Sequence, residues 1–578
     1  MPITPLLLIL AFLICTSVSA SDPRVSMGDF TFVGRQISES VEFFGDVPFA
    51  EAPVGDLRLR PPILKNFTAG KEIVFNATHF GPSCIQTLVP AEELSEDCLT
   101  LSIFRPANLA LEDKQHGLPV MIWFYGGGYI VGSSSMYDGT PLVNRSVFRG
   151  TPTIFIAANY RLGPLGFPRG DDVAREAASG SRILNLGLQD NIAALQWIQK
   201  HIASFGGDPS KVTVFGESAG AGAIEFLLLS SALKGLARAA IMESAGGFPA
   251  IPPKSSSANT VWNNFMAALP QCNNTAMTDD IECIRQLSTP EIIDGFNKAQ
   301  LFFNTSGKGD WSPTADGITV PDLPSTSRPD YGLLEAVMMG NNKDEATLFT
   351  DQMTNSTQAI MDMILGSPPS PPNASPSQRK IQLQKLRHIL NETLVLYPNV
   401  ASLGSPFGTG NETFGLNPEY KRTAAVSTDF LFNAARRFHI NQRLLPAGIS
   451  TFSYLFADPD AVPVQDFVSG NPAPGSLGST HSSEIFYVFG TLKDRPELRE
   501  VTPTAAKLSK MMMDYWISFA NVLNPNDGKG SSRPSWPEYE AHRHVLMQLN
   551  GYNTTAIMDD FRERQIALFS RDPAVFGQ

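Results

Sequence analysis

The stretch Gly216-Glu217-Ser218-Ala219-Gly220 constrains the fold of this chain more than any other. The residues before it, 212–215, are β-branched or aromatic and indicate a short buried strand, whereas the apolar run 221–233 indicates a buried helix. A serine between a strand and a helix lies on a tight turn, where only small residues two positions away let the two segments pass. The pattern therefore predicts a turn that exposes the Ser218 hydroxyl and points the positive end of a helix at any anion formed beside it.

Strand-like and helix-like segments alternate through the rest of the chain. Strand patterns occupy residues 118–124, 153–158, 212–215, 239–242, 334–339, 450–455 and 544–549, and helix patterns occupy 186–204, 219–233 and 504–522. The alternation predicts an α/β fold with a large, mostly parallel central sheet, helices on both faces and loop insertions. The proline-rich residues 367–377 and the glycine-rich residues 402–416 are expected to be surface loops rather than linkers, so residues 21–578 are expected to form a single domain.

Residues 1–20 have the pattern of a signal peptide, in which an apolar core is followed by small residues that end at Ala20. The mature chain is expected to begin at Ser21 and to be secreted, soluble and without a transmembrane anchor, because no other apolar run reaches the about 18 residues that a membrane span needs. Ten Asn-x-Ser/Thr sequons fit an extracellular glycoprotein. These glycosylation candidates are Asn66, Asn76, Asn144, Asn273, Asn304, Asn355, Asn373, Asn391, Asn411 and Asn553.

Charge and cysteine content exclude several classes of function. A net charge of -12 over 578 residues argues against binding to nucleic acid by bulk electrostatics. Neither H-E-x-x-H nor C-x-x-C occurs, and His542-x-His544 is interpreted as strand residues, so no metal site and no cofactor are expected. Pairing of sequence neighbours, Cys84 with Cys98 and Cys272 with Cys283, would close two short loops worth about 3 kcal/mol each.

A serine nucleophile needs a base, and the base needs a carboxylate that fixes its tautomer. Among eight histidines, His481 is the best candidate, because it lies in a loop of small residues, 475–484, ahead of an apolar segment. Two adjacent acids, Asp344 and Glu345, follow a predicted strand at the sheet edge where active sites gather, and both qualify on chemistry alone. The chain order Ser218, Glu345, His481 matches the serine–acid–histidine order of α/β-hydrolases.

The oxyanion of an ester hydrolysis needs backbone N–H donors, and glycines let the chain approach closely enough to supply them. The segment Phe124-Tyr125-Gly126-Gly127-Gly128-Tyr129 directly follows a predicted strand. A triple glycine alone is usually a flexible turn. Its strand context and its position upstream of Ser218 favour an oxyanion loop here.

Several ordered motifs together resemble the type-B carboxylesterase/lipase family of cholinesterase-like α/β-hydrolases, and most closely its fungal secreted members. The motifs are 48–55, Glu96-Asp97-Cys98-Leu99, Asn159-Tyr160-Arg161-Leu162-Gly163, the run from Asn185 to the pentapeptide, and His481-Ser482-Ser483-Glu484-Ile485. They cover nearly the whole mature chain. The resemblance implies a catalytic triad and an oxyanion hole at matching positions: Ser218 as nucleophile, Glu345 as acid, His481 as base, and the N–H groups of Gly127, Gly128 and Ala219 as donors.

The resemblance also implies both neighbour disulfides and a structural salt bridge between Arg58 and Glu96. Two positions depart from the family's pattern. Ala346 stands where a glycine usually follows the acid, and Tyr125 stands where His or Phe often precedes the three glycines. Neither departure removes a catalytic atom, although the first is able to shift the Glu345 loop.

The expected function is hydrolysis of carboxylic esters through an acyl-enzyme intermediate. The ester substrate is expected to be a small molecule or a lipid. Only 13 residues separate Cys84 from Cys98, and four of them are acidic. A loop this short cannot form the long lid of lipases that resemble this chain, and it lacks the tryptophan that binds choline. Short-chain or soluble esters are therefore favoured. A triacylglycerol or sterol-ester lipase, with its cover built from loops such as 402–416, and a non-catalytic cholinesterase-like binding protein are the alternatives; the acyl group, the alcohol and the oligomeric state stay open.

Overall fold

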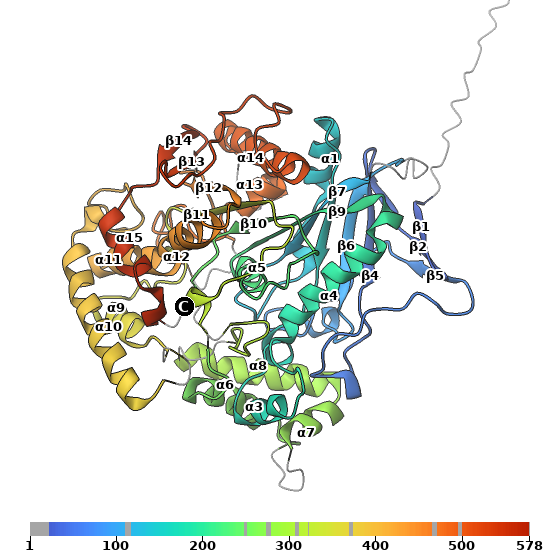
Figure 1. Ribbon diagram of the computed structural model, residues 1–578, viewed down its shortest axis with the longest axis horizontal. Coiled ribbons are helices and arrows are strands. Elements are labelled where there is room, and N and C mark those ends of the chain that lie inside the picture. Colours follow the sequence, from blue (N-terminus) through green and yellow to red (C-terminus); the bar gives the residue numbers. More distant parts are fainter. Residues whose placement is uncertain are drawn as a thin grey trace, which may run out of the picture.

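An eleven-stranded sheet runs through the centre of the computed structural model (Figure 1). The structure describes residues 22–109, 117–247, 251–272, 279–306, 311–321, 323–368, 371, 374–464, 471–494 and 500–576, with backbone alone for 300–306. In spatial order the strands are β14 (Thr555–Met558), β13 (Val545–Leu549), β12 (Ser450–Phe456), β11 (Ala336–Asn342), β10 (Ala239–Glu243), β9 (Gly207–Glu217), β7 (Leu118–Phe124), β8 (Ile154–Ala158), β6 (Thr100–Pro106), β4 (Val41–Pro48) and β3 (Arg35–Ser38).

Strands β13 to β8 in this order pair in parallel, and antiparallel pairs occur only toward the two edges. The predicted mostly parallel sheet is therefore confirmed. Its central strands are buried along their length, because both faces of the sheet are covered. The predicted strands are all present, with β11 displaced two to three residues toward its C-terminus relative to 334–339.

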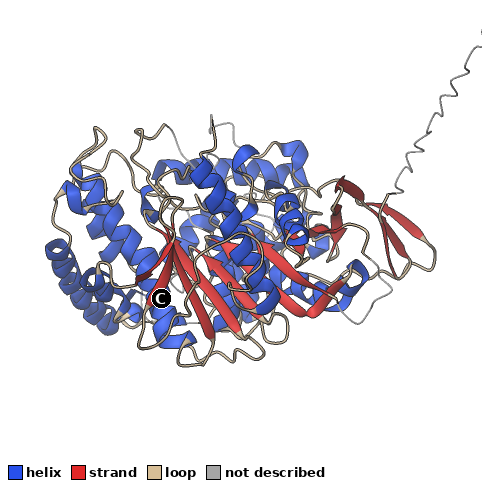
Figure 2. Ribbon diagram, turned by 90° about the horizontal axis from the view of Figure 1, so that it is seen from above, coloured by secondary structure: helices blue, strands red, loops and turns tan. Residues whose placement is uncertain are grey.

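Helices lie on both faces of the sheet (Figure 2). They are α1 (Thr140–Phe148), α2 (Gly163–Gly166), α3 (Asp171–Ala178), α4 (Leu186–His201), α5 (Ala219–Leu229), α6 (Ser256–Ala267), α7 (Asp280–Gln286), α8 (Thr289–Ser306), α9 (Gln358–Leu365), α10 (Pro376–Leu396), α11 (Pro418–Thr428), α12 (Ala434–His439), α13 (Ile485–Phe489), α14 (Pro503–Val522) and α15 (Glu563–Ser570). None of the described helices is both long and apolar enough to cross a membrane.

The two faces of the sheet belong to different hydrophobic cores. In β7, Met121 and Trp123 join the core that contains α13 and α14, whereas Val120 and Ile122 join a second core with the C-terminal half of α4. This division follows from the strand geometry, because successive side chains point to opposite faces. The alternation explains how one uninterrupted apolar strand serves two layers of helices.

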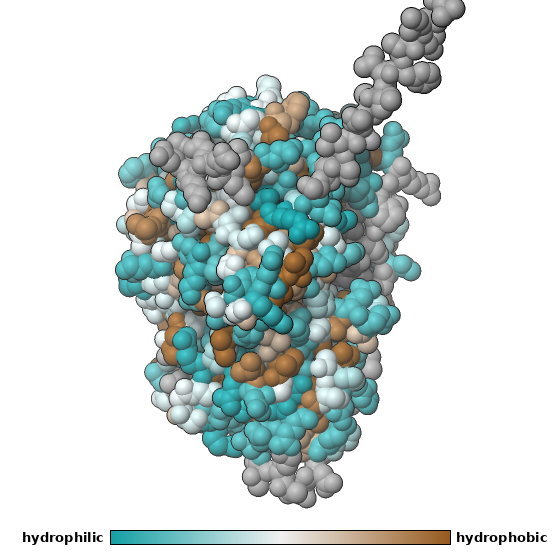
Figure 3. All heavy atoms as spheres, turned by 90° about the vertical axis from the view of Figure 1, so that its right-hand side faces the viewer, coloured by the Kyte–Doolittle hydropathy of each residue, from teal (hydrophilic) through white to brown (hydrophobic). Residues whose placement is uncertain are grey.

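Two smaller units flank the sheet. Strands β1 (Arg24–Met27), β2 (Phe30–Val33) and β5 (Ile73–Asn76) form a separate three-stranded sheet at the right of Figure 1. On that side of the molecule, hydrophobic residues occur as small patches among polar ones (Figure 3), which is usual for a protein surface. At the opposite side, α9, α10, α11 and α15 pack around a third apolar cluster.

Candidate active site

Ser218 lies on a strained turn between the end of β9 and the start of α5. Its backbone angles, φ 54° and ψ −123°, are in a region that L-residues rarely occupy. The glycines two residues away are needed because the last carbonyl of β7 passes them: a Cβ on Gly216 or Gly220 would lie 2.6 or 1.9 Å from the Phe124 oxygen. The sequence-based explanation for these glycines is thus borne out by the close approach of β7.

The triple-glycine loop follows β7 and lies against the serine. A Cβ on Gly126 would be 3.0 Å from Ser218 Cβ, and both Gly127 and Gly128 have positive φ. Within the described part of the chain, the N–H groups of Gly127 and Gly128 have no hydrogen-bond acceptor. Ala219 is the first residue of α5, where a helix leaves its N–H groups unpaired. The three predicted oxyanion donors are therefore free and lie in segments adjacent to Ser218.

Glu345 and His481 come together in the interior. Glu345 begins a short 3-10 turn after β11, and its Oε1 accepts a hydrogen bond from the Asn342 N–H at 2.7 Å. Its Oε2 lies 2.6 Å from Nδ1 of His481. Both side chains are buried. This contact separates the two acids that chemistry alone left equivalent, because Glu345 reaches the imidazole and Asp344 points elsewhere.

Asp344 binds two loops near the histidine, 402–416 and 475–484. Its carboxylate accepts hydrogen bonds from Ser405 Oγ at 2.9 Å, Phe407 N at 2.7 Å and Ser479 N at 3.1 Å. Burial raises the pKa of this carboxyl, although Lys343 opposes the shift. The prediction that residues 402–416 form a surface loop is wrong for Gly404, Ser405 and Pro406, which are buried; Ser405 binds Asp344 there.

Two aromatic rings pack against the imidazole of His481. The ring centroids of Phe349 and Phe432 lie 4.9 and 5.1 Å from that of His481, and the two phenyl rings stack on each other. Phe432 is buried, whereas Phe349 is 57% exposed. The exposed ring of Phe349 therefore covers one side of the buried imidazole.

A group of buried carboxyls lies behind the histidine. Glu217 Oε1 accepts a hydrogen bond from Ser482 Oγ at 2.5 Å, and Glu484 accepts from Asn342 and Ser244. Burial, opposed by His481, raises the pKa of Glu217 to about 7. Burial and the neighbouring carboxylates Glu217 and Glu345 raise the pKa of Glu484 to about 8. Sequence analysis did not single out either residue for chemistry, since an isolated glutamate carries no signal of burial.

The second ring nitrogen of His481, Nε2, has no hydrogen-bond partner among the described residues. It lies 3.2 Å from Glu217 Oε1, and no hydrogen bond joins it to Ser218 Oγ. Catalytic hydrogen bonds are often loose in a free enzyme and tighten when substrate binds. Burial alone would lower the pKa of His481, but the charges of Glu217 and Glu345 outweigh it and raise the pKa to about 9.

The remaining predicted features are distributed around this site. Disulfides join Cys84 to Cys98 and Cys272 to Cys283, and Arg58 forms a buried two-point ion pair with Glu96. No group of three or more metal-binding side chains occurs among the described residues. Residues 1–20, Asn273, Asn373 and the side chain of Asn304 lie outside the described residues. Of the other sequons, Asn144 is half-buried and the rest are exposed: Asn66, Asn76, Asn355, Asn391, Asn411 and Asn553.

Comparisons with known proteins identify the family and the fold of the chain. The model of the carboxylesterase family matches residues 28–569. Lipase 2 of Geotrichum candidum is 29% identical over 602 residues, which cover 97% of each chain. A secreted triacylglycerol lipase of Gibberella zeae is 30% identical over 581 residues, covering 94% of this chain and 89% of the relative. The crystal structure of Aspergillus niger EstA has a TM-score of 0.75 at 23% identity, covers 96% of this chain and 99% of its own, and shares the α/β-hydrolase fold.

Proposed function

The chain belongs to the carboxylesterase family and is a carboxylic ester hydrolase, and we propose that Ser218, His481 and Glu345 are its catalytic triad. The hydrogen bond between Glu345 Oε2 and His481 Nδ1 is the observation that carries this proposal. A carboxylate at Nδ1 fixes the tautomer that leaves Nε2 free to accept a proton, and it stabilises the imidazolium that forms. Ser218, on its strained turn, is the nucleophile that supplies this proton.

The reaction proceeds in two acyl transfers. His481 Nε2 takes the Ser218 proton while Oγ attacks the ester carbonyl, and the N–H groups of Gly127, Gly128 and Ala219 hold the oxyanion. The C–O bond to the alcohol then breaks, and the alcohol leaves with the proton from His481. Water, deprotonated by the same imidazole, attacks the acyl-enzyme and releases the acid.

We propose short-chain or soluble esters as the substrates. The loop between Cys84 and Cys98 is closed on itself by backbone hydrogen bonds of Ser83 with Glu93 and Ser95, so it forms a short rim and not a long cover. Phe349 and Phe432 offer an apolar wall beside His481 that suits a small acyl or alkyl group. An N-terminal signal peptide and secretion form part of the same proposal.

A lipase is the second candidate. Its support is the name of the Gibberella zeae relative, a secreted triacylglycerol lipase, together with the exposure of Phe349 and of Leu88, which is 84% exposed in the disulfide loop. Exposed apolar side chains around a site are suited to contact with an oil droplet. The two candidates differ in the chain length that they hydrolyse best.

The experiment is hydrolysis of p-nitrophenyl esters with acyl chains of about two to sixteen carbons, with Ser218→Ala as the matched inactive variant. A maximum at short chains, lost in Ser218→Ala, supports the esterase. A maximum at long chains that rises at an oil–water interface supports the lipase instead. If the triad is correct, Ser218→Ala should lose at least ~10³ in kcat. Turnover that persists in this variant would overturn the triad.

A further inference from the structure

We propose that Tyr160 and Gln86 are positioning residues that hold the two ends of the oxyanion loop, residues 125–132. The inference rests on the proposed function, in which Gly127 and Gly128 of this loop donate to the oxyanion. Neither side chain belongs to the triad. Tyr160 fixes the start of the loop and Gln86 fixes its end, so that the glycine N–H groups between them keep their direction.

Tyr160 and Tyr125 bind each other reciprocally at the start of the loop. The Tyr160 hydroxyl donates to the Tyr125 carbonyl at 2.7 Å. The Tyr125 hydroxyl donates to the Tyr160 carbonyl at 3.0 Å and accepts from the Tyr160 N–H at 3.2 Å. Their rings stack with centroids 4.4 Å apart. Because the bonded carbonyl of Tyr125 belongs to the peptide unit that leads into Gly126, its orientation sets the course of the glycines that follow.

Both tyrosines are fully buried, and burial raises the pKa of each hydroxyl above its usual range. The hydroxyls therefore keep their protons and remain donors at any pH at which an esterase works. A buried pair with all these bonds formed is rigid, because breaking one bond would leave a buried polar group unsatisfied.

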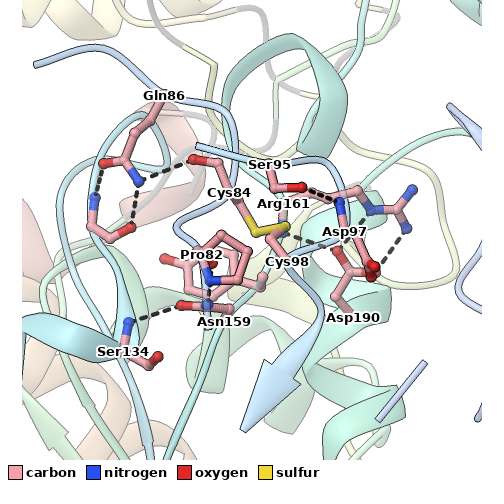
Figure 4. The surroundings of a disulfide bond; sticks show 12 residues. Pro82, Cys84, Gln86, Ser95, Asp97, Cys98, Ser134, Asn159, Arg161 and Asp190 are labelled. Atoms are coloured by element: carbon pink, nitrogen blue, oxygen red, sulfur yellow. Dashed lines mark hydrogen bonds and ion pairs between the residues drawn. A yellow bond between two sulfur atoms is a disulfide. The ribbon is translucent and has the colours of Figure 1, made fainter. Parts of the chain in front are cut away.

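Gln86 binds the far end of the loop through its side-chain amide (Figure 4). Its Nε2 donates to the Gly132 carbonyl at 2.9 Å, and its Oε1 accepts from the Gly132 N–H at 2.8 Å. Nε2 also donates to the Cys84 carbonyl at 3.1 Å. Gln86 is 2% exposed, so these bonds form away from water. The amide thus connects the disulfide loop to the backbone of the oxyanion loop.

The two attachments meet inside the loop. A Cβ on Gly132 would lie 2.5 Å from the Tyr125 ring and 2.9 Å from the Gly126 carbonyl, so the end of the loop packs directly on its beginning. Between them, the N–H groups of Ile130 and Val131 both donate to the Gly127 carbonyl at 3.1 Å. With both ends and this turn fixed, the Gly127 and Gly128 donors have little freedom to move.

Such positioning matters because oxyanion donors act only over a narrow range of distance. A donor must lie about 2.7–3.1 Å from the oxyanion, and a displacement of about 1 Å is able to cost about 100-fold in rate. Loss of the hydrogen bonds of Tyr160 or Gln86 is thus expected to destabilise the tetrahedral transition state more than the planar ester in the Michaelis complex. This difference separates positioning from a general effect on stability.

The test compares Tyr160→Phe and Gln86→Met with the wild-type enzyme. Tyr160→Phe removes one hydroxyl and keeps the stacked ring, and Gln86→Met keeps the side-chain length and removes the three hydrogen bonds. For each variant we would measure kcat and KM for p-nitrophenyl butyrate and the inhibition constant of a trifluoromethyl ketone. That inhibitor forms a hemiketal with the nucleophile and places an oxyanion in the hole.

The expected result is a roughly 10- to 100-fold fall in kcat with KM nearly unchanged, and a loss of ketone affinity by the same factor. Gln86→Leu, which also lacks the amide, serves as the second variant if Gln86→Met does not fold, and it should show the same loss of kcat and ketone affinity.

Two control variants make the same chemical changes at buried sites outside the active site. Tyr515→Phe removes a buried hydroxyl that donates to the Pro534 carbonyl at 2.6 Å. Gln189→Met removes an amide that binds the carbonyls of Arg182 and Leu184. Both should keep kcat and ketone affinity within about twofold of wild type, whatever happens to the melting temperature.

Melting temperatures that fall in Tyr160→Phe and Gln86→Met while kcat and ketone affinity stay at wild-type values would overturn the proposal. Failure of the triad itself would be seen differently. In that case the wild-type enzyme would not bind the ketone covalently at Ser218, and Tyr160→Phe and Gln86→Met would show no loss of ketone affinity.

Discussion

Nε2 of His481 lies 3.2 Å from Oε1 of Glu217, the residue that directly precedes Ser218. His481, the proposed base, thus has a carboxylate near each of its ring nitrogens, because Glu345 Oε2 lies at Nδ1. Burial disfavours the charged imidazole, and the two carboxylates favour it by a larger amount, so the pKa of His481 is raised. The hydroxyl of Ser482, which donates to the same Glu217 oxygen, holds that carboxylate in place.

The contact between Glu217 and His481 leads to a prediction about the pH dependence of the reaction. Only neutral His481 accepts the serine proton, so kcat/KM should fall as pH decreases through the raised pKa of His481. Glu217→Gln removes one of the charges that raise this pKa, and the acid limb of the profile should therefore move to lower pH. A pH series of kcat/KM for both enzymes measures the shift. Glu42→Gln, a change at a buried glutamate paired with Arg105, is the control and should leave the limb in place; an unmoved limb in Glu217→Gln would contradict the prediction.

Asp344→Asn should impair both stability and turnover. The amide cannot accept all three hydrogen bonds from Ser405, Phe407 and Ser479, and its NH₂ group would face at least one N–H donor. We expect a loss of about 2 kcal/mol in the free energy of unfolding, since bonds to a charged acceptor are worth ~1.5–3 kcal/mol. Because Ser479 lies two residues before His481, kcat should fall more than KM rises. Wild-type kcat together with a wild-type melting temperature would show that Asp344 holds neither loop.

The buried ion pair of Arg58 and Glu96 gives a prediction about stability alone. Arg58 also donates to the carbonyls of Ile284 and Leu287, and thereby connects the disulfide loop to the end of α7. Arg58→Met leaves the carboxylate of Glu96 buried without its partner and should cost about 3–5 kcal/mol. The double variant Arg58→Met/Glu96→Leu should recover much of that loss. Thermal unfolding of the wild type, Arg58→Met and the double variant measures these changes. A double variant no more stable than Arg58→Met would show that the unpaired carboxylate of Glu96 is not the cause of the loss.

The sequons differ in their suitability for N-glycosylation. Asn144 lies in α1, and its side-chain oxygen accepts hydrogen bonds from Ser38 and Ser40. The exposed sequons include Asn66 and Asn355. In secreted protein we expect glycans at exposed sequons and none at Asn144. Peptide mass spectrometry after enzymatic deglycosylation in heavy-oxygen water reports each site, and a glycan found at Asn144 would contradict the prediction.

The local pattern around Ser218 was enough to predict the elbow, because the requirement for glycine at 216 and 220 depends on one passing strand. The sheet was predictable for a similar reason: buried parallel strands are continuous apolar runs. Helix ends were less well predicted. A helix was predicted as far as Leu233, but α5 ends at Leu229, because Ser230 caps the helix and Ser231 has a positive φ that cannot continue it.

The surroundings of the triad could not be predicted from residue types. Asp344 and Glu345 are adjacent and chemically alike, and only the fold decides which one reaches His481. The burial of Glu217 and Glu484 depends on segments more than 200 residues apart in the sequence, as does the contact of Glu217 with Ser482. Long-range contacts of this kind leave no local pattern.

The most direct test of the account is covalent labelling with a p-nitrophenyl phosphonate, followed by peptide mapping. The triad predicts one phosphonate per chain, attached to Ser218 Oγ, with loss of esterase activity in proportion to the label. Ser218→Ala should take up none. A label on another residue that abolishes activity, or full activity after complete labelling of Ser218, would contradict the central claim that this serine carries the acyl group.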